Sequence, residues 1–230
     1  MKSKIFELVF KFLIVAFGIC GIFLPDPNGM AKQFWFFTLQ TNVFVVIFAA
    51  ILCVCIVLEL CCNKPVAFAT KKTFLTLKLM VSFFITITGV IYCFVLAPAG
   101  IIYNHPDAPN MFNLRNVLLH IVVPIMTVVD YFLFSPKIYI SKKTAFAFLI
   151  YPIFYFLLVN VRVWCGGTPF YDGTMYPYFF IDPTLDNQGW GAVCLYLAVI
   201  SILFYLLARL YIYLSNKVLT KQQNKKIEKM

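Results

Sequence analysis

Charged residues are scarce in this chain. Only 12% of its 230 residues are Asp, Glu, Lys or Arg, whereas 62% are hydrophobic and the mean hydropathy is +0.88. Soluble globular domains carry about 25% charged residues, so this composition excludes an ordinary soluble protein. We therefore expect an integral membrane protein.

Motifs of the common soluble enzymes are also missing. The sequence has no GxSxG elbow, no HExxH zinc motif, no phosphate-binding glycine loop and no dinucleotide fingerprint. Only two histidines occur in the whole chain, and the eight cysteines show no pairing framework. Cys53 and Cys55 would point to different sides of a helix, so we expect no metal site and no cofactor.

Long apolar runs dominate what is present. A helix that crosses a bilayer needs roughly 20 mostly apolar residues, and six such segments follow one another along the chain. They cover residues 5–24, 35–58, 73–97, 113–135, 144–164 and 190–214. We predict an all-α, polytopic six-helix transmembrane bundle over residues 1–216, followed by a basic cytoplasmic tail at 217–230.

The distribution of basic residues predicts the orientation in the membrane. Lys and Arg concentrate on the cytoplasmic side of membrane proteins, and here lysines gather at the start, in the loops after spans two and four, and in the tail. These lysines are Lys2, Lys4, Lys64, Lys71, Lys72, Lys137, Lys142, Lys143, Lys217, Lys221, Lys225, Lys226 and Lys229. The opposite loops carry the acidic residues Asp26, Asp107, Asp172, Asp182 and Asp186. Both termini are therefore predicted to be cytoplasmic.

The net charge of +10 follows from this topology. The basic residues are spread over four short segments rather than one folded face, so we expect no nucleic acid partner. Anionic membrane lipids are the expected contact of these segments. The short chain, the unpaired cysteines and the lack of a targeting motif favour a bacterial plasma membrane, and the oligomeric state is left open.

Polar side chains interrupt the apolar runs at one depth, within roughly 12 Å of the outer boundary at about 1.5 Å per residue. They are Thr38, Thr41 and Asn42 in span two, Arg115, Asn116 and His120 in span four, and Asn160 and Arg162 in span five. Polar groups that face lipid are costly, so such residues usually turn toward the bundle and mark function. We expect them to line a polar pocket beneath the outer loop at 165–189. Hydrogen bonding between helices is the alternative role for the Thr and Asn side chains.

His120 is the only histidine in any predicted span. A neutral imidazole can take the proton of a Thr hydroxyl and so activate it as a nucleophile. Thr38 could meet His120 if spans two and four pack together, and Asn42, Asn116 or Arg115 could then donate hydrogen bonds to an oxyanion. The depth of this layer suits the ester carbonyl of a lipid whose chains stay in the bilayer.

A second polar layer lies near the cytoplasmic face. It consists of Lys11, Glu59, Lys78 and Asp130. We predict that Lys78 and Asp130 form an ion pair that holds helices together. A proton or ion relay toward His120 is the alternative.

Several motifs resemble the Pr6Pr integral membrane family. They are "FFTLQTN" in span two, "HIVVP" and "DYFLF" in span four, "YPIFYF" in span five, and "YPYFFID" ahead of Gly189. That family is similar in layout to the androgen-induced-gene (FAR-17a-like) proteins, six-span hydrolases of fatty acid esters of hydroxy fatty acids. The resemblance implies a membrane-embedded Thr nucleophile and a His, which the motifs match to Thr38 and His120. The His-to-Pro spacing is four residues here and five in the hydrolases, and Thr41 is a second candidate nucleophile.

Two functions remain open on these residues. The first is a Thr/His hydrolase that acts on a lipid ester in the outer leaflet. The alternative is a non-enzymatic membrane protein that binds or moves a small lipid-like molecule. A transporter is disfavoured because the sequence shows no internal repeat, and Pro124 is the only strongly kinking residue of span four.

Overall fold

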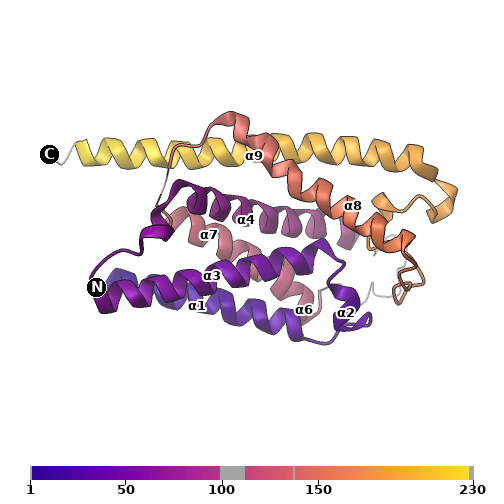
Figure 1. Ribbon diagram of the computed structural model, residues 1–230, viewed down its shortest axis with the longest axis horizontal. Helices are drawn as coiled ribbons and strands as arrows, with labels where there is room; N and C mark the ends of the chain where they lie inside the picture. The colour runs from indigo at the N-terminus through magenta and orange to yellow at the C-terminus, as the bar shows by residue number, and fades with distance from the viewer. Residues whose placement is uncertain (1, 99–111, 137, 228–230) are drawn as a thin grey trace. The chain divides into compact units, whose positions relative to one another are not determined.

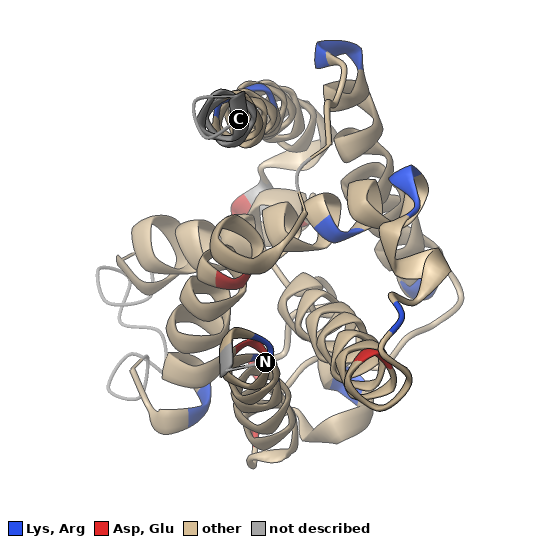
Figure 2. Ribbon diagram, turned by 90° about the vertical axis from the view of Figure 1, so that its left-hand side faces the viewer, with Lys and Arg blue, Asp and Glu red and all other residues tan. Residues whose placement is uncertain are grey.

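The described part of the chain is helical and contains no strand. The computed structural model describes residues 2–98, 112–136 and 138–227. Six helices in these ranges are long and apolar enough to cross a membrane: Ser3–Phe23, Phe37–Cys62, Lys72–Leu96, Leu114–Phe134, Lys142–Trp164 and Gly189–Thr220. Each overlaps one predicted span, so the all-α six-span fold is confirmed (Figure 1). The chain is a multi-pass integral membrane protein, and most of its ribbon carries neither acidic nor basic residues (Figure 2).

The chain divides into two compact units. The first unit comprises Met1–Pro25, Phe37–Tyr139 and Ser215–Met230. Its main helices are α1 (Lys2–Phe23), α3 (Phe37–Cys62), α4 (Lys72–Ile91) and α7 (Val123–Phe134), with the short α6 (Leu114–Val117) before α7. Helices α1, α3, α4 and α7 pack against one another (Figure 1).

Apolar side chains and glycines bring these four helices together. One core cluster consists of Ile14, Val45, Ala49, Ile85 and Val123, and another of Ile22, Leu39 and Leu119. A Cβ atom on Gly21 of α1 would lie 2.7 Å from the side chain of Leu119. Helices in lipid associate through close van der Waals packing, which small residues permit. Gly21 therefore sets how closely α1 approaches the fourth span.

Two π-helical turns interrupt the third and fourth spans. They are η2 (Tyr92–Leu96), which follows α4, and η4 (Leu118–Val122), which lies between α6 and α7. In η4 the N–H of Val123 bonds to the carbonyl of Leu118, and Pro124 has no N–H. The α-helical partners of the Leu119 and His120 carbonyls are therefore lost, since those partners would be the N–H groups of residues 123 and 124. Such turns often occur at functional sites.

The second unit comprises Asp26–Phe36 and Ile140–Leu214. It contains α2 (Gly29–Gln33), η5 (Lys142–Leu149), α8 (Ile150–Trp164), η6 (Phe179–Ile181), η7 (Leu185–Asn187) and most of α9 (Gly189–Ile227). Helix α9 runs without a break through residue 217, where we predicted the tail to begin, because residues 192–227 include no Gly or Pro. The predicted loop residues Asp107 and Lys137, and Lys229 of the tail, lie outside the described residues.

Candidate functional site

The polar face of α3 forms at the start of the helix. The backbone carbonyl of Thr38 accepts hydrogen bonds from Thr41 Oγ1 at 3.0 Å and from Asn42 Nδ2 at 2.9 Å. Thr41 and Asn42 are buried, whereas Thr38 is half-buried. The three residues thus share one face, as their spacing predicts.

Asn42 also bonds to the fourth span. Its Nδ2 donates to the carbonyl of Leu119 at 3.1 Å, which the π turn and Pro124 leave without a helical partner. Both Nδ2 protons are therefore used, so Asn42 has no donor left for an oxyanion. Its Oδ1 is buried and has no partner among the described residues, which makes Asn42 a potential acceptor instead.

Thr41 connects α3 to α4. Its hydroxyl lies 2.8 Å from the hydroxyl of Thr88, which in turn lies 3.1 Å from the carbonyl of Phe84. Each hydroxyl has one proton, so both protons are committed inside this cluster. The hydroxyl of Thr38 differs, because it has no hydrogen bond to any residue that the structure describes.

His120 lies in η4 and is 7% exposed. Its ring stacks on the ring of Tyr92 in η2, with centroids 3.7 Å apart and planes 15° from parallel. The ring also hydrogen-bonds to the backbone of Thr88. Nδ1 is buried and lacks a partner among the described residues, so the bond to Thr88 belongs to Nε2.

Gly89 allows α4 to approach the backbone of the fourth span closely at His120. A Cβ atom at Gly89 would lie 2.8 Å from the carbonyl oxygen of His120 and 3.3 Å from the ring of Pro124. The first of these contacts is with backbone, which cannot move aside as a flexible side chain would. Only glycine fits at this position.

Arg115 and Asn116 begin the fourth span in α6. Asn113 caps this short helix, its side chain accepting from the N–H of Asn116 at 2.8 Å. The side chains of Arg115 and Asn116 are half-buried, and the positive charge of Arg115 repels a positive charge on the His120 ring. They remain the predicted residues nearest in sequence to His120 that carry donors.

Asn160 and Arg162 belong to the second unit, and their contacts hold the outer loop. Arg162 donates from one Nη to the carbonyl of Met175 at 2.8 Å and from the other to the carbonyl of Thr168. Its guanidinium also lies 4.6 Å from the ring centroid of Phe170. Asn160 Nδ2 donates to the carbonyl of Phe156, within its own helix, at 2.9 Å. A pocket shared by spans two, four and five stays a prediction.

Tyr176 of the outer loop completes the contacts of Asn160. Its hydroxyl donates to Asn160 Oδ1 at 3.5 Å. Burial, with a smaller contribution from Asp182, raises the pKa of the Tyr176 phenol. The phenol therefore stays protonated and remains a donor at neutral pH.

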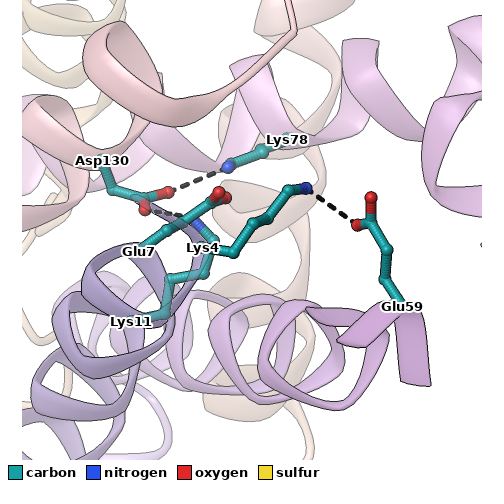
Figure 3. A network of polar contacts seen from close by, with 6 residues as sticks. All are labelled: Lys4, Glu7, Lys11, Glu59, Lys78 and Asp130. Atoms are coloured by element: carbon teal, nitrogen blue, oxygen red, sulfur yellow. Dashed lines mark hydrogen bonds and ion pairs between the residues drawn. The ribbon is translucent and has the colours of Figure 1, made fainter. Parts of the chain in front are cut away.

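The second polar layer forms a network of charges in the first unit (Figure 3). Lys78 Nζ lies 2.9 Å from Asp130 Oδ2, so the predicted ion pair is confirmed. Lys11 is fully buried and pairs with the other oxygen of Asp130 and with Glu7 at 3.1 Å. Two lysines and two carboxylates thus balance one another.

A more exposed ion pair extends this network. Lys4 pairs with Glu59 at 2.8 Å, with side chains 42% and 31% exposed. The charged side chains therefore come from α1, α3, α4 and α7 (Figure 3).

The site also includes three residues of the third span that were not predicted from the sequence: Thr88, Gly89 and Tyr92. The depth of Thr88 in the membrane is the signal that points to it. Thr88 lies eight positions before Leu96, the end of the span, which places it about 12 Å below the outer boundary. That is close to the expected depth of His120. Tyr92 gives no such signal, since aromatic residues are common in all the spans.

These features define a six-span, all-α membrane protein with a buried Thr, Asn and His cluster in its first unit. Within the described residues no group of three or more His, Cys, Asp or Glu could hold a metal ion. Searches of protein-family models, of curated proteins and of solved structures find no match to this chain.

Proposed function

We propose that this protein is a membrane-embedded hydrolase that cleaves the ester of a lipid in the outer leaflet, in a bacterial plasma membrane. The single observation that carries the proposal is His120: it is buried, one ring nitrogen is bonded to the backbone of Thr88, and Nδ1 has no partner among the described residues. A neutral imidazole with an open nitrogen can act as a general base.

Thr38 is the proposed nucleophile. Its hydroxyl makes no hydrogen bond to a described residue, whereas the hydroxyl of Thr41 is bonded to Thr88. Thr38 also lies next to Leu39, which packs in one cluster with Leu119, the neighbour of His120. The open hydroxyl of Thr38 and the packing of its neighbour Leu39 against Leu119 favour Thr38 over Thr41.

The proposed reaction has two steps. In the first, Thr38 Oγ attacks the ester carbonyl carbon, His120 takes the hydroxyl proton, and the carbon–oxygen bond to the alcohol breaks as His120 returns the proton to that alcohol. In the second, His120 takes a proton from water as the water attacks the acyl carbonyl carbon. The bond from that carbon to Thr38 Oγ then breaks as His120 returns the proton to Thr38, and the fatty acid is released. Arg115 and Asn116 are the proposed donors to the oxyanion.

Labelling with a fluorophosphonate probe tests the proposal. We expect the wild-type protein in native membranes to be labelled and the Thr38→Ala and His120→Ala variants to lose labelling. Thr86→Ala is the matched control, because the Thr86 hydroxyl bonds to the carbonyl of Ser82 in its own helix, at 2.7 Å. Thr41→Val should keep most of the labelling.

The pH dependence is a second readout of the same proposal. Labelling should fall as the pH is lowered, because protonated His120 cannot accept the Thr38 proton. Equal labelling of the wild type, Thr38→Ala and His120→Ala would refute the hydrolase. Retained binding of a lipid by those two variants would then favour the non-enzymatic alternative.

A further inference from the structure

The π turns of the third and fourth spans meet at one pair of rings. Tyr92 is the first residue of η2, and His120 is the middle residue of η4. Their rings are nearly parallel and 3.7 Å apart at the centroids. Tyr92 is 5% exposed, so both faces of this stack lie inside the protein. A buried stack of this kind fixes the plane of the imidazole.

The backbone of Thr88 fixes the proton on the imidazole. Thr88 lies inside α4, where its N–H is engaged within the helix, so the group that bonds to His120 is the carbonyl. A carbonyl only accepts hydrogen bonds. His120 therefore carries its proton on Nε2, and the lone pair of Nδ1 is left open.

We infer that Tyr92 and the carbonyl of Thr88 are positioning groups that set His120 as an Nδ1 base. The inference rests on the proposed hydrolase for its catalytic meaning. The carbonyl selects the Nε2–H tautomer, and the Tyr92 ring holds the imidazole plane so that Nδ1 keeps one direction. Neither group touches the substrate. A histidine base depends on such a fixed tautomer and orientation, which a second group usually supplies.

The tautomer of His120 can be observed directly. The chain has only two histidines, so His105→Gln leaves His120 as the sole imidazole. Nitrogen NMR of this variant, labelled with ¹⁵N-histidine in nanodiscs near neutral pH, should show a protonated Nε2 and an unprotonated Nδ1. A spectrum with the proton on Nδ1, or with both tautomers equally populated, would overturn the inference.

Two variants in the His105→Gln background separate the carbonyl from the hydroxyl of Thr88 and test the ring. Thr88→Val removes the hydroxyl that bonds to Thr41 but keeps the carbonyl, so the tautomer should not change. Tyr92→Leu should mix the two tautomers, and Tyr92→Phe should restore the single one. A change of tautomer in Thr88→Val, or none in a folded Tyr92→Leu, would contradict the assignment.

Kinetics connect this arrangement to the reaction. In the wild-type background Tyr92→Leu should lower kcat by on the order of tenfold or more with little change in KM, since it misorients the base rather than the substrate. Tyr92→Phe should recover most of this loss. A single Nε2–H tautomer in a protein without hydrolase activity would refute the proposed function and keep the positioning. Hydrolase activity that is the same in wild type and Tyr92→Leu would refute the positioning and keep the function.

Discussion

At the scale of single residues, the site depends on how closely two backbones approach. Gly89→Ala would place a methyl group 2.8 Å from the carbonyl oxygen of His120. We expect it to lower the free energy of unfolding by about 1–3 kcal/mol, the usual cost of overpacking. Thermal or denaturant unfolding of the protein in detergent measures this.

Gly191→Ala is the matched control for that substitution. Gly191 also lies in a helix, and a Cβ atom there would have nothing within 4 Å. Alanine is a better helix former than glycine by about 1 kcal/mol, so this variant should be as stable as the wild type or more so. A Gly89→Ala variant that matches Gly191→Ala would show that the two backbones are not in contact.

Single residues also show what the sequence could and could not predict about the site. The sequence predicted that Thr41, Asn42 and His120 turn toward the bundle, because a polar side chain in an apolar span needs a partner. The partners themselves were not predictable, because Asn42 bonds to a carbonyl that is free only through a π turn and Pro124. The sequence does not show a change of helix type. The loop contacts of Arg162 could not be predicted either, because its partners are backbone carbonyls, which every residue carries.

At the scale of structural elements, Arg162 holds the outer loop to the end of α8. Arg162→Gln would lose the charge and the contacts with Phe170, as well as one or both bonds to the carbonyls of Met175 and Thr168. A loop without these contacts opens locally more often. We expect faster protease cleavage near Tyr171, measured by limited proteolysis of the purified protein.

Arg209→Gln is the control for the loss of an arginine charge. The guanidinium of Arg209 contacts Tyr205 in its own helix, at 2.9 Å between Nη1 and the hydroxyl, and holds no loop. Its proteolysis should match that of the wild type. Arg162→Gln with wild-type cleavage would mean that the aromatic contacts of the loop are sufficient by themselves.

The elements themselves were largely predictable. All six spans follow from apolar runs, because the bilayer demands about 20 such residues whatever the packing. The ion pair between Lys78 and Asp130 was predictable as well, since buried charges need partners. That Lys11 joins the same carboxylate was not, because its depth in the first span does not reveal which face of α1 turns inward.

At the scale of the whole molecule, the charge network tests how the helices of the first unit are held together. Lys78→Met leaves one excess negative charge among Lys11, Glu7 and Asp130, and Asp130→Leu leaves one excess positive charge. Each single change should destabilise the protein by about 3–5 kcal/mol.

The double variant should recover part of that loss, because the remaining Lys11 and Glu7 balance each other. Lys4→Met should cost at most about 1 kcal/mol, since its pair with Glu59 is more exposed. Unfolding of the four variants in detergent gives the coupling free energy. Simple additivity of the two single changes would show that Lys78 and Asp130 do not stabilise each other.

The orientation of the whole molecule can be tested with its own cysteines. Cys165 follows the end of α8 and Cys61 lies in the last turn of α3, and both are exposed. Because lysines follow Cys61 in the loop after span two, the positive-inside rule predicts that Cys61 is cytoplasmic and Cys165 is outside.

In variants that keep only one of these cysteines, a membrane-impermeant maleimide should label Cys165 in intact cells and Cys61 only after permeabilisation. A variant without cysteines gives the background. Labelling of Cys61 but not Cys165 in intact cells would reverse the topology, and would move the proposed ester hydrolase to the cytoplasmic leaflet.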